Sequence, residues 1–207
     1  MTSKPPAQSY RRYPRETRGA MLVDAGSACL ARGGITAFTV ENICREAQVS
    51  RGLIGHHFGT KDALLAAVYA SMYERFMEVI ALPDEEELSA AALVEACVAP
   101  EVFNPDSLRT WLALWGEIAN NAELRAEHRL RYRDFLDRVE RIILAEARRR
   151  SVEVDARSAA LQFVALSDGL WLEHAIDTSM LSRSSARDAL FEFLENALGG
   201  TTRDRAR

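Results

Sequence analysis

Four nitrogen-bearing side chains between residues 51 and 61 have the chemistry needed to bind DNA. Arg51 carries a permanently charged planar guanidinium, which can donate two hydrogen bonds to O6 and N7 of a guanine. His56, His57 and Lys61 follow as donors that could meet phosphates. Gly52, next to Arg51, would let the backbone approach a duplex closely. This chemistry is hydrogen bonding to base edges and phosphates.

Two short helices are predicted to position these side chains. The first spans residues 40–47, because its apolar residues follow i, i+3, i+4 and i+7 spacing, and Thr39 precedes it as a candidate N-cap: Val40, Ile43, Cys44 and Ala47. Ser50 is a candidate cap for a second helix, which Ile54 and Phe58 would anchor to the same core. Two short helices joined by a tight turn predict a helix-turn-helix whose second helix enters the major groove. The alternative is a helical pair that packs and binds nothing.

A wider pattern surrounds the predicted pair. It comprises Gly33-Gly34, Phe38-Thr39-Val40, Ile43, Val49-Ser50-Arg51-Gly52, Ile54, His56-His57-Phe58, Lys61 and Ala63-Leu64-Leu65. This pattern resembles the DNA-binding domain of the tetracycline-repressor family of bacterial regulators, over roughly residues 15 to 65. With the resemblance, the expected DNA contacts are Arg15, Thr39, Ser50, Arg51, Gly52, Leu53, His56, His57 and Lys61.

Two residues depart from the family pattern. Gln48 stands where the family usually has glycine in the turn, so a residue with a Cβ must adopt left-handed backbone, or the turn differs. Gly55 replaces an aromatic residue that often contacts a phosphate, and a glycine within a helix costs about 1 kcal/mol relative to alanine.

Composition limits the class of protein. The 207 residues suffice for one large or two small domains, and no apolar run is long enough to span a membrane. With no apolar N-terminal segment either, we expect a soluble cytoplasmic protein with no membrane partner. Cys29, Cys44 and Cys97 lack the spacing of a zinc site or a disulfide framework, so no metal or cofactor is implied.

Charge divides unevenly along the chain. Residues 1–62 carry nine basic and five acidic residues, for a net charge of +4, whereas residues 63–207 carry −8. A basic end on an acidic body suits a protein that holds one end against a polyanion. Chance unevenness is the alternative.

Helical periodicity continues beyond the predicted helix-turn-helix and predicts an all-α protein of about nine helices. We expect a flexible arm at 1–14, a helix-turn-helix domain at 15–75, a regulatory and dimerisation domain at 76–200 and a flexible tail at 201–207. Arg11, Arg12 and Arg15 could add phosphate or minor-groove contacts from the arm. Further helices are expected at 15–32, 60–81, 88–99, 106–120, 122–150, 155–180 and 186–198. The arginine-rich face of the 122–150 helix suggests ion pairs with solvent-exposed acids.

The last two predicted helices carry more apolar residues than one face can hold. The apolar residues of 155–180 form two lines, and 186–198 has a similar excess. Such surplus suggests a two-fold dimer interface, which the family resemblance also implies. Two recognition helices would then enter successive major grooves of a palindromic operator, about 34 to 36 Å apart.

Three tryptophans suggest an effector site in the body. Trp111 and Trp115 are one turn apart, and Trp171 follows Asp168 by one turn. The segments 111–115 and 168–172 resemble the choline- and betaine-responsive subgroup of the family, which implies a small cationic effector. Physically, each cation–π contact contributes up to about 2 kcal/mol when desolvated. Tryptophans that only anchor a core, and an apolar, drug-like or absent effector, are the alternatives.

Three functions follow from these patterns. The first is a homodimeric repressor that leaves its operator when it binds a small molecule. The second is an enzyme using His56, His57, Asp168 or His174, although adjacent histidines diverge by about 100° on a helix. The third is a helical interaction protein without operator specificity.

Overall fold

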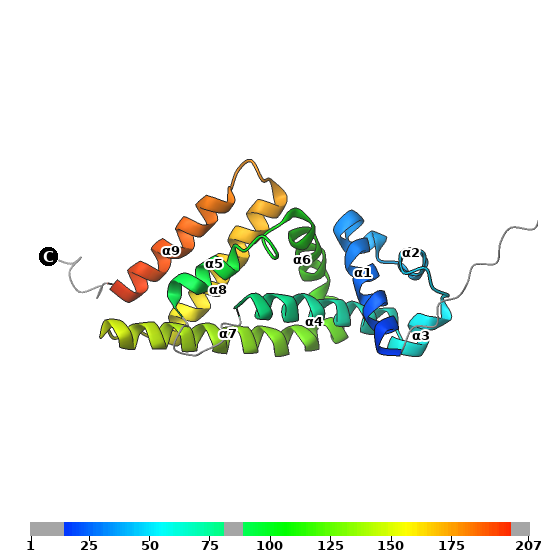
Figure 1. Cartoon of the computed structure of the whole chain (residues 1–207), viewed down its shortest axis with the longest axis horizontal. Helices are drawn as coiled ribbons and strands as arrows, with labels where there is room; N and C mark the ends of the chain where they lie inside the picture. Colours follow the sequence, from blue (N-terminus) through cyan, green and yellow to red (C-terminus); the bar gives the residue numbers. More distant parts are fainter. Residues whose placement is uncertain (1–14, 81–88, 200–207) are drawn as a thin grey trace, which may run out of the picture.

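The computed structural model describes residues 15–80 and 89–199, and this part of the chain is entirely helical, with no strand (Figure 1). The prediction of an all-α fold with about nine helices is confirmed. The predicted arm at 1–14, the acidic turn at 83–87 and the tail at 201–207 lie outside the described residues. The helices are α1 (Arg15–Ala37), α2 (Val40–Glu46), α3 (Gly52–Phe58), α4 (Lys61–Ile80), α5 (Ala90–Cys97), α6 (Pro105–Ile118), α7 (Ala122–Arg150), α8 (Ala156–Ile176) and α9 (Arg183–Gly199).

The helices α1, α2 and α3 form a head at one end of the molecule, and α4 leads from it into the body (Figure 1). Thr39 caps α2, since its hydroxyl accepts a hydrogen bond from the Asn42 N–H at 3.1 Å. Thr60 accepts from the Ala63 N–H at 2.9 Å and caps α4 in the same way. The Thr39 cap was predicted, and the Thr60 cap agrees with the predicted start of a helix at residue 60.

The predicted side-chain cap at Ser50 is wrong. A capping side chain needs extended backbone at the N-cap, but the residue at that position is Arg51, which is already helical with φ −56° and ψ −35°. The Leu53 N–H donates to the Ser50 carbonyl at 3.0 Å, so a backbone turn satisfies it. The Ser50 hydroxyl is therefore left exposed at the start of α3.

Two backbone positions define the turns of the head. Gln48 has φ 55°, so this residue adopts the left-handed conformation despite its Cβ, and the turn between α2 and α3 is retained. Gly33 and Gly34 interrupt α1, and Gly34 has φ 62°, which favours glycine. The regular part of α1 therefore ends near Arg32, as predicted, and one more helical turn follows.

Close packing joins the head to α4. Gly26 of α1 leaves room for Phe38 and Val68, since a Cβ at residue 26 would lie 2.9 Å from an atom of each. Phe38 and Val68 are fully buried. The helix α4 continues past the predicted domain boundary at residue 75, and that boundary stays a prediction.

The body starts its helices on polar caps. Asn104 caps α6 through the Ser107 N–H at 3.0 Å, and Pro105 takes the first helical position, so α6 begins one residue earlier than predicted. Ser89 caps α5, which is shorter at both ends than the predicted 88–99 helix. The bounds predicted for α7 are confirmed, and Ser151, with φ 55°, ends this helix.

The arginine-rich face of α7 forms ion pairs with neighbouring acids. Arg131 lies 2.7 Å from Glu127 of the same helix and 3.0 Å from Glu74 of α4. Arg138 donates to the Ile80 carbonyl at 3.2 Å. These contacts tie α7 to α4, in agreement with the ion-pair interpretation of this face.

The antiparallel pair of α8 and α9 lies on the side of the body away from the head (Figure 1). The helix α8 ends at Ile176, short of the predicted residue 180, because Asp177 is extended and accepts the Ser179 N–H at 2.8 Å. Leu161 and Ile176 expose 52% and 64% of their surface. The helix α8 therefore has apolar surface left over after its own subunit has packed, as the sequence predicted.

Candidate DNA-binding surface and effector site

The helix α3 exposes polar residues, and its apolar residues Leu53, Ile54 and Phe58 pack against the core. Arg51 exposes 72% of its side chain, and Gly52, His56 and Lys61 are also exposed. Ile54, on the opposite side, is only 3% exposed and belongs to the core. Lys61 begins α4, directly after α3, and α3 lies in the head at one end of the molecule (Figure 1).

The other predicted contact residues differ in how exposed they are and in whether they already make contacts within the protein. Ser50 is exposed, whereas Thr39 is exposed but already engaged as the α2 cap. Leu53 and His57 are half-buried, and Leu53 packs against the core. Arg15 begins α1, but its side chain lies outside the described part of the chain.

Two charged residues of α2 that the sequence analysis did not single out lie beside this surface. Glu41 is 3.6 Å from Arg51 and 3.5 Å from Arg45. The i, i+4 spacing of Glu41 and Arg45 was a visible sequence signal for their pairing. The approach of Arg51 to Glu41 crosses from α3 to α2 and depends on the turn between them.

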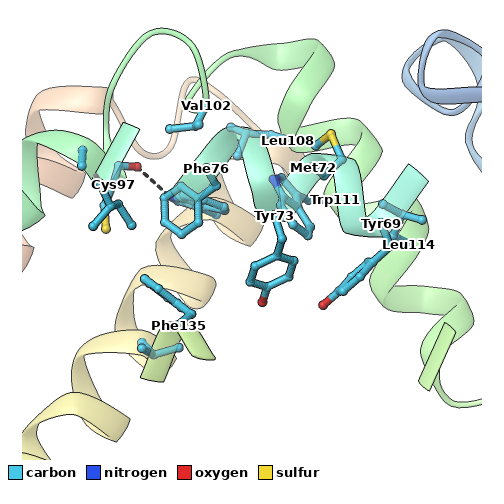
Figure 2. Packing of buried hydrophobic residues seen from close by; sticks show 14 of the residues in the cluster. Tyr69, Met72, Tyr73, Phe76, Cys97, Val102, Leu108, Trp111, Leu114 and Phe135 are labelled. Atoms are coloured by element: carbon cyan, nitrogen blue, oxygen red, sulfur yellow. Dashed lines mark hydrogen bonds between the residues drawn. The ribbon is translucent and has the colours of Figure 1, made fainter. Parts of the chain in front are cut away.

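The three tryptophans of the body form one aromatic cluster, in which Trp111 contacts the other two. The ring centroid of Trp111 lies 6.0 Å from that of Trp115 and 6.2 Å from that of Trp171. Tyr69 and Tyr73 of α4 approach the Trp111 ring edge-on, at 5.5 and 5.0 Å. Figure 2 shows the two tyrosine hydroxyls directed towards the same side of the cluster. The cluster therefore joins α4, α6 and α8.

Asp168 lies beside these rings. Burial raises the pKa of its carboxyl from 3.8 to about 7. Burial, and then the charge of Asp168, raise the pKa of the Tyr73 and Tyr132 hydroxyls. No ion-pair partner of Asp168, such as an arginine, occurs among residues 15–80 and 89–199.

Trp171 also has a structural role. Its indole N–H donates to the Cys97 carbonyl at 3.0 Å, and its ring packs edge-on against Phe76, with centroids 5.2 Å apart. Only 4% of its surface is exposed. Trp171 is therefore both a core anchor and a wall of the cluster.

A cavity of about 530 Å³ opens elsewhere, where α7 ends and α8 begins. It is lined by Leu144, Ala147, Arg148, Val152, Glu153, Val154 and Asp155. None of the tryptophans borders it, and it is widely open to solvent. The aromatic cluster, where the rings of Trp111 and Tyr73 lie near the charge of Asp168, is the better candidate for a cation site.

Metal and membrane chemistry find no support in the part of the chain that the structure describes. No group of three or more histidine, cysteine or acidic side chains there could hold a metal ion. No helix within the described ranges is both long and apolar enough to cross a bilayer.

Comparison with known proteins assigns the chain to a family. Residues 22–68 match the model of the bacterial regulatory proteins of the tetR family, and residues 85–199 match that of the C-terminal domain of BetI-type transcriptional repressors. The second match alone covers more than half of the chain. The chain belongs to the tetR family, with a BetI-type C-terminal domain.

Similar tetR-family proteins extend over nearly the whole chain. A curated relative, the HTH-type transcriptional regulator BetI of Burkholderia mallei (strain NCTC 10229), is 28% identical over 189 residues, which are 89% of this chain and 95% of the relative. The crystal structure of a transcriptional regulator from Pseudomonas aeruginosa PAO1 is 30% identical, with a TM-score of 0.79, covering 94% and 97% of the two chains. A regulator from Saccharomonospora viridis, solved in complex with choline, shares the fold at 22% identity and a TM-score of 0.72, covering 88% and 97%.

Family membership decides between the three functions. As a tetR-family protein of BetI type, the chain is a homodimeric, DNA-binding transcriptional repressor that responds to a small molecule, and it is not an enzyme. The expectation of the tetracycline-repressor family, with its betaine-responsive subgroup, is confirmed.

Sequence reasoning missed part of the aromatic cluster of this tetR-family protein. Tyr69, Tyr73 and Phe76 follow i, i+4 and i+7 spacing on α4, but that spacing also describes an ordinary core stripe. His128 and Tyr132 of α7 complete the group, with ring centroids 5.3 Å apart. Nothing in one sequence shows that α4, α6, α7 and α8 bring these rings to the same place.

An ion pair and a hydrogen bond connect the helices of the aromatic cluster to α1 of the head. The Tyr69 hydroxyl lies 2.7 Å from Nδ1 of His128, and on the same α4 Arg75 pairs with Asp24 of α1 at 2.6 Å. On α6, the Arg109 Nε–H donates to the Ala31 carbonyl of α1 at 3.0 Å. The helices α4 and α6, which both carry rings of the aromatic cluster, are thus bonded directly to α1.

Proposed function

We propose that α3 recognises an operator through Arg51, with Lys61 and His56 contacting phosphates. The observation that supports this assignment is that all three side chains are exposed, whereas Ile54, which lies between them in the sequence, is buried. A guanidinium at the start of a recognition helix is placed where side chains meet base edges. Ser50, Gly52 and the other predicted residues would complete the contact surface.

The two-fold dimer would form through α8 and α9. The exposed Leu161 and Ile176 leave apolar surface on α8 that a second copy can cover. This symmetry would place two copies of α3 about 34 to 36 Å apart, one helical turn of DNA. A palindromic operator follows from that geometry.

The effector that this chain's body suits best is a small organic cation such as choline. The observation that carries this proposal is the Asp168 carboxyl, whose charge acts on the Tyr73 and Tyr132 hydroxyls of the aromatic cluster and which has no ion-pair partner among the described residues. A quaternary ammonium would contact the faces of Trp111, Trp115 and Trp171 and neutralise the carboxylate. The choline complex of the Saccharomonospora viridis regulator supports the same ligand class.

Release from DNA follows from the packing of the empty cluster. Trp111 touches Tyr69, Tyr73 and the other tryptophans, so a cation can enter only if rings of α4 and α6 move apart. Both helices are bonded to α1 through Arg75 and Arg109. Effector binding would therefore favour a second arrangement of the head, with a different spacing of the two α3 helices.

Titration calorimetry of the purified dimer with choline and with its uncharged isostere 3,3-dimethylbutan-1-ol tests the effector class. The proposal predicts saturable binding of choline and at least tenfold weaker binding of the isostere, since only the cation gains from the carboxylate and the ring faces. Equal binding of both would favour the apolar or drug-like effector. Binding of neither would refute the cationic site.

We place this activity in the cytoplasm, where a bacterial regulator meets DNA. No described helix can cross a membrane, which is consistent with that location. Fractionation of the native host, followed by immunoblotting, tests it, and recovery in the membrane pellet would contradict it.

A further inference from the structure

Glu41, in the first turn of α2, lies between two arginines on the predicted DNA-binding surface. One of its carboxylate oxygens is 3.6 Å from a guanidinium nitrogen of Arg51, and the other is 3.5 Å from one of Arg45. The three side chains expose between 64% and 72% of their surface. Exposed ion pairs at such distances add little to stability. These ion pairs can still restrict the orientation of the two arginine side chains.

The pairing is part of a longer network. The Arg45 guanidinium also donates to Oδ1 of Asn42 at 3.3 Å, and the Asn42 amide donates to the Ala37 carbonyl at 3.0 Å. This series of contacts runs from the backbone before α2 to the first turn of α3. A free arginine side chain loses considerable rotamer entropy when it binds, and a fixed acidic neighbour reduces that loss.

We propose that Glu41 is a positioning residue for operator recognition, which holds the Arg51 guanidinium in the orientation that meets a base edge. The proposal rests on the base contact assigned to Arg51 above. The same carboxylate places a negative charge near the phosphates, which weakens binding to unrelated DNA. Because this repulsion acts on operator and unrelated DNA alike, Glu41 raises specificity through the orientation of Arg51.

The chain offers a matched control on the same helix. Glu46 pairs with Arg32 of α1 at 2.6 Å rather than with Arg51, and 37% of its side chain is exposed. E41Q and E46Q therefore remove the same charge from the same helix, but only E41Q releases Arg51. Circular dichroism and the urea midpoint establish that each variant is folded, and E41A serves as a second variant at the position.

The experiment begins with selection of the preferred site by the wild-type dimer from randomised duplexes. Affinities are then measured for that site and for each single base-pair variant of it, at several salt concentrations. E41Q should lose about three- to tenfold of the discrimination at the base pair that R51A affects, the range expected when one long side chain is freed. Both glutamine variants should bind unrelated DNA more tightly, and E41Q should have no further effect at that base pair in the R51A background.

Two results would overturn the proposal directly. Unchanged discrimination in E41Q and E41A would show that Arg51 needs no acidic neighbour. Loss at a different base pair would show that Glu41 itself contacts a base. If instead R51A fails to affect any single base pair, the base contact of the proposed function is wrong and the positioning role falls with it.

Discussion

The proposed functional residues are exposed in the head of this protein and buried in its body. In the head, Arg51, His56 and Lys61 are exposed, and the fold does not need their side chains. In the body, Trp111 and Trp171 are 2% and 4% exposed, so they belong to the core, and the effector site that we propose uses the same two residues. Recognition of DNA can therefore vary without loss of the fold, whereas effector recognition is tied to packing and so to conformation.

The largest expected effect tests this contrast through stability. Trp111→Ala should lower the free energy of unfolding by about 3 to 5 kcal/mol, because it empties a buried aromatic site. His56→Ala should change it by no more than about 0.5 kcal/mol, as is typical of an exposed residue. Urea unfolding followed by circular dichroism measures both. Equal destabilisation by the two variants would contradict the division between the regions.

The second prediction concerns charge in the effector site. Because burial raises the pKa of Asp168 to about 7, the carboxyl is largely protonated below that pH and must lose its proton to hold a cation. Choline affinity should therefore fall about tenfold for each pH unit below 7 and level off above 8. The raised pKa values of Tyr73 and Tyr132 and the lowered pKa of His128 keep these neighbours neutral at pH 7 to 8.

Asp168→Asn is the control for this dependence. It should weaken choline binding at pH 8 by about 100-fold, or about 2.7 kcal/mol, and remove the pH profile. In the wild type without effector, stability should fall as pH rises from about 4 to about 7, because the unfolded chain then binds fewer protons than the folded one. If the choline affinity of the wild type does not change with pH, Asp168 does not face the cation.

The third prediction returns to the head. Arg51→Ala should lose about 1 to 3 kcal/mol of discrimination at one base pair, whereas Lys61→Ala should weaken all sequences alike and lower the salt slope by about one. Fluorescence anisotropy with operator variants at several salt concentrations separates the two patterns. If Arg51→Ala weakens every sequence equally, its base contact is refuted.

The smallest expected effect lies between the regions. Tyr69→Phe removes the hydroxyl that meets His128 and should cost about 1 kcal/mol of stability, the usual net contribution of one hydrogen bond. It should also reduce the factor by which effector weakens DNA binding, because it loosens α4 from α7. Tyr73→Phe provides a comparison on the same helix. An unchanged factor in Tyr69→Phe would show that this bond does not transmit the signal.

How far the sequence could predict each region follows from the same contrast. The head is built from local signals: the caps at Thr39 and Thr60, the anchor Ile54 and the outward Arg51 all lie within about 20 residues, and spacing predicts them. The one wrong cap, at Ser50, failed because a backbone turn started the helix without a side chain. Helix boundaries in the body were off by a few residues where a cap such as Asn104 or a turn such as Asp177 decided them.

The effector site depends on contacts between distant segments. Trp111, Trp115, Asp168 and Trp171 were predicted as one site through a family resemblance. The structure brings the three tryptophans together from α6 and α8, and the charge of Asp168 acts on Tyr73 of the same cluster. Tyr69 and Tyr73 had no such signal, because a buried aromatic residue on a helix has the same spacing whether it packs a core or faces a ligand. Only the packing of α4 against α6 in the structure shows that Tyr69 and Tyr73 belong to the cluster.

The central claim is that a cation held by Asp168 and the tryptophans controls the exposed surface of α3. Operator affinity of the dimer, measured at pH 8 with and without saturating choline, tests it most directly. The account predicts at least tenfold weaker operator binding with choline in the wild type and no change in Asp168→Asn at the same choline concentration. Choline that binds without altering operator affinity, or an equal loss in both proteins, would contradict it.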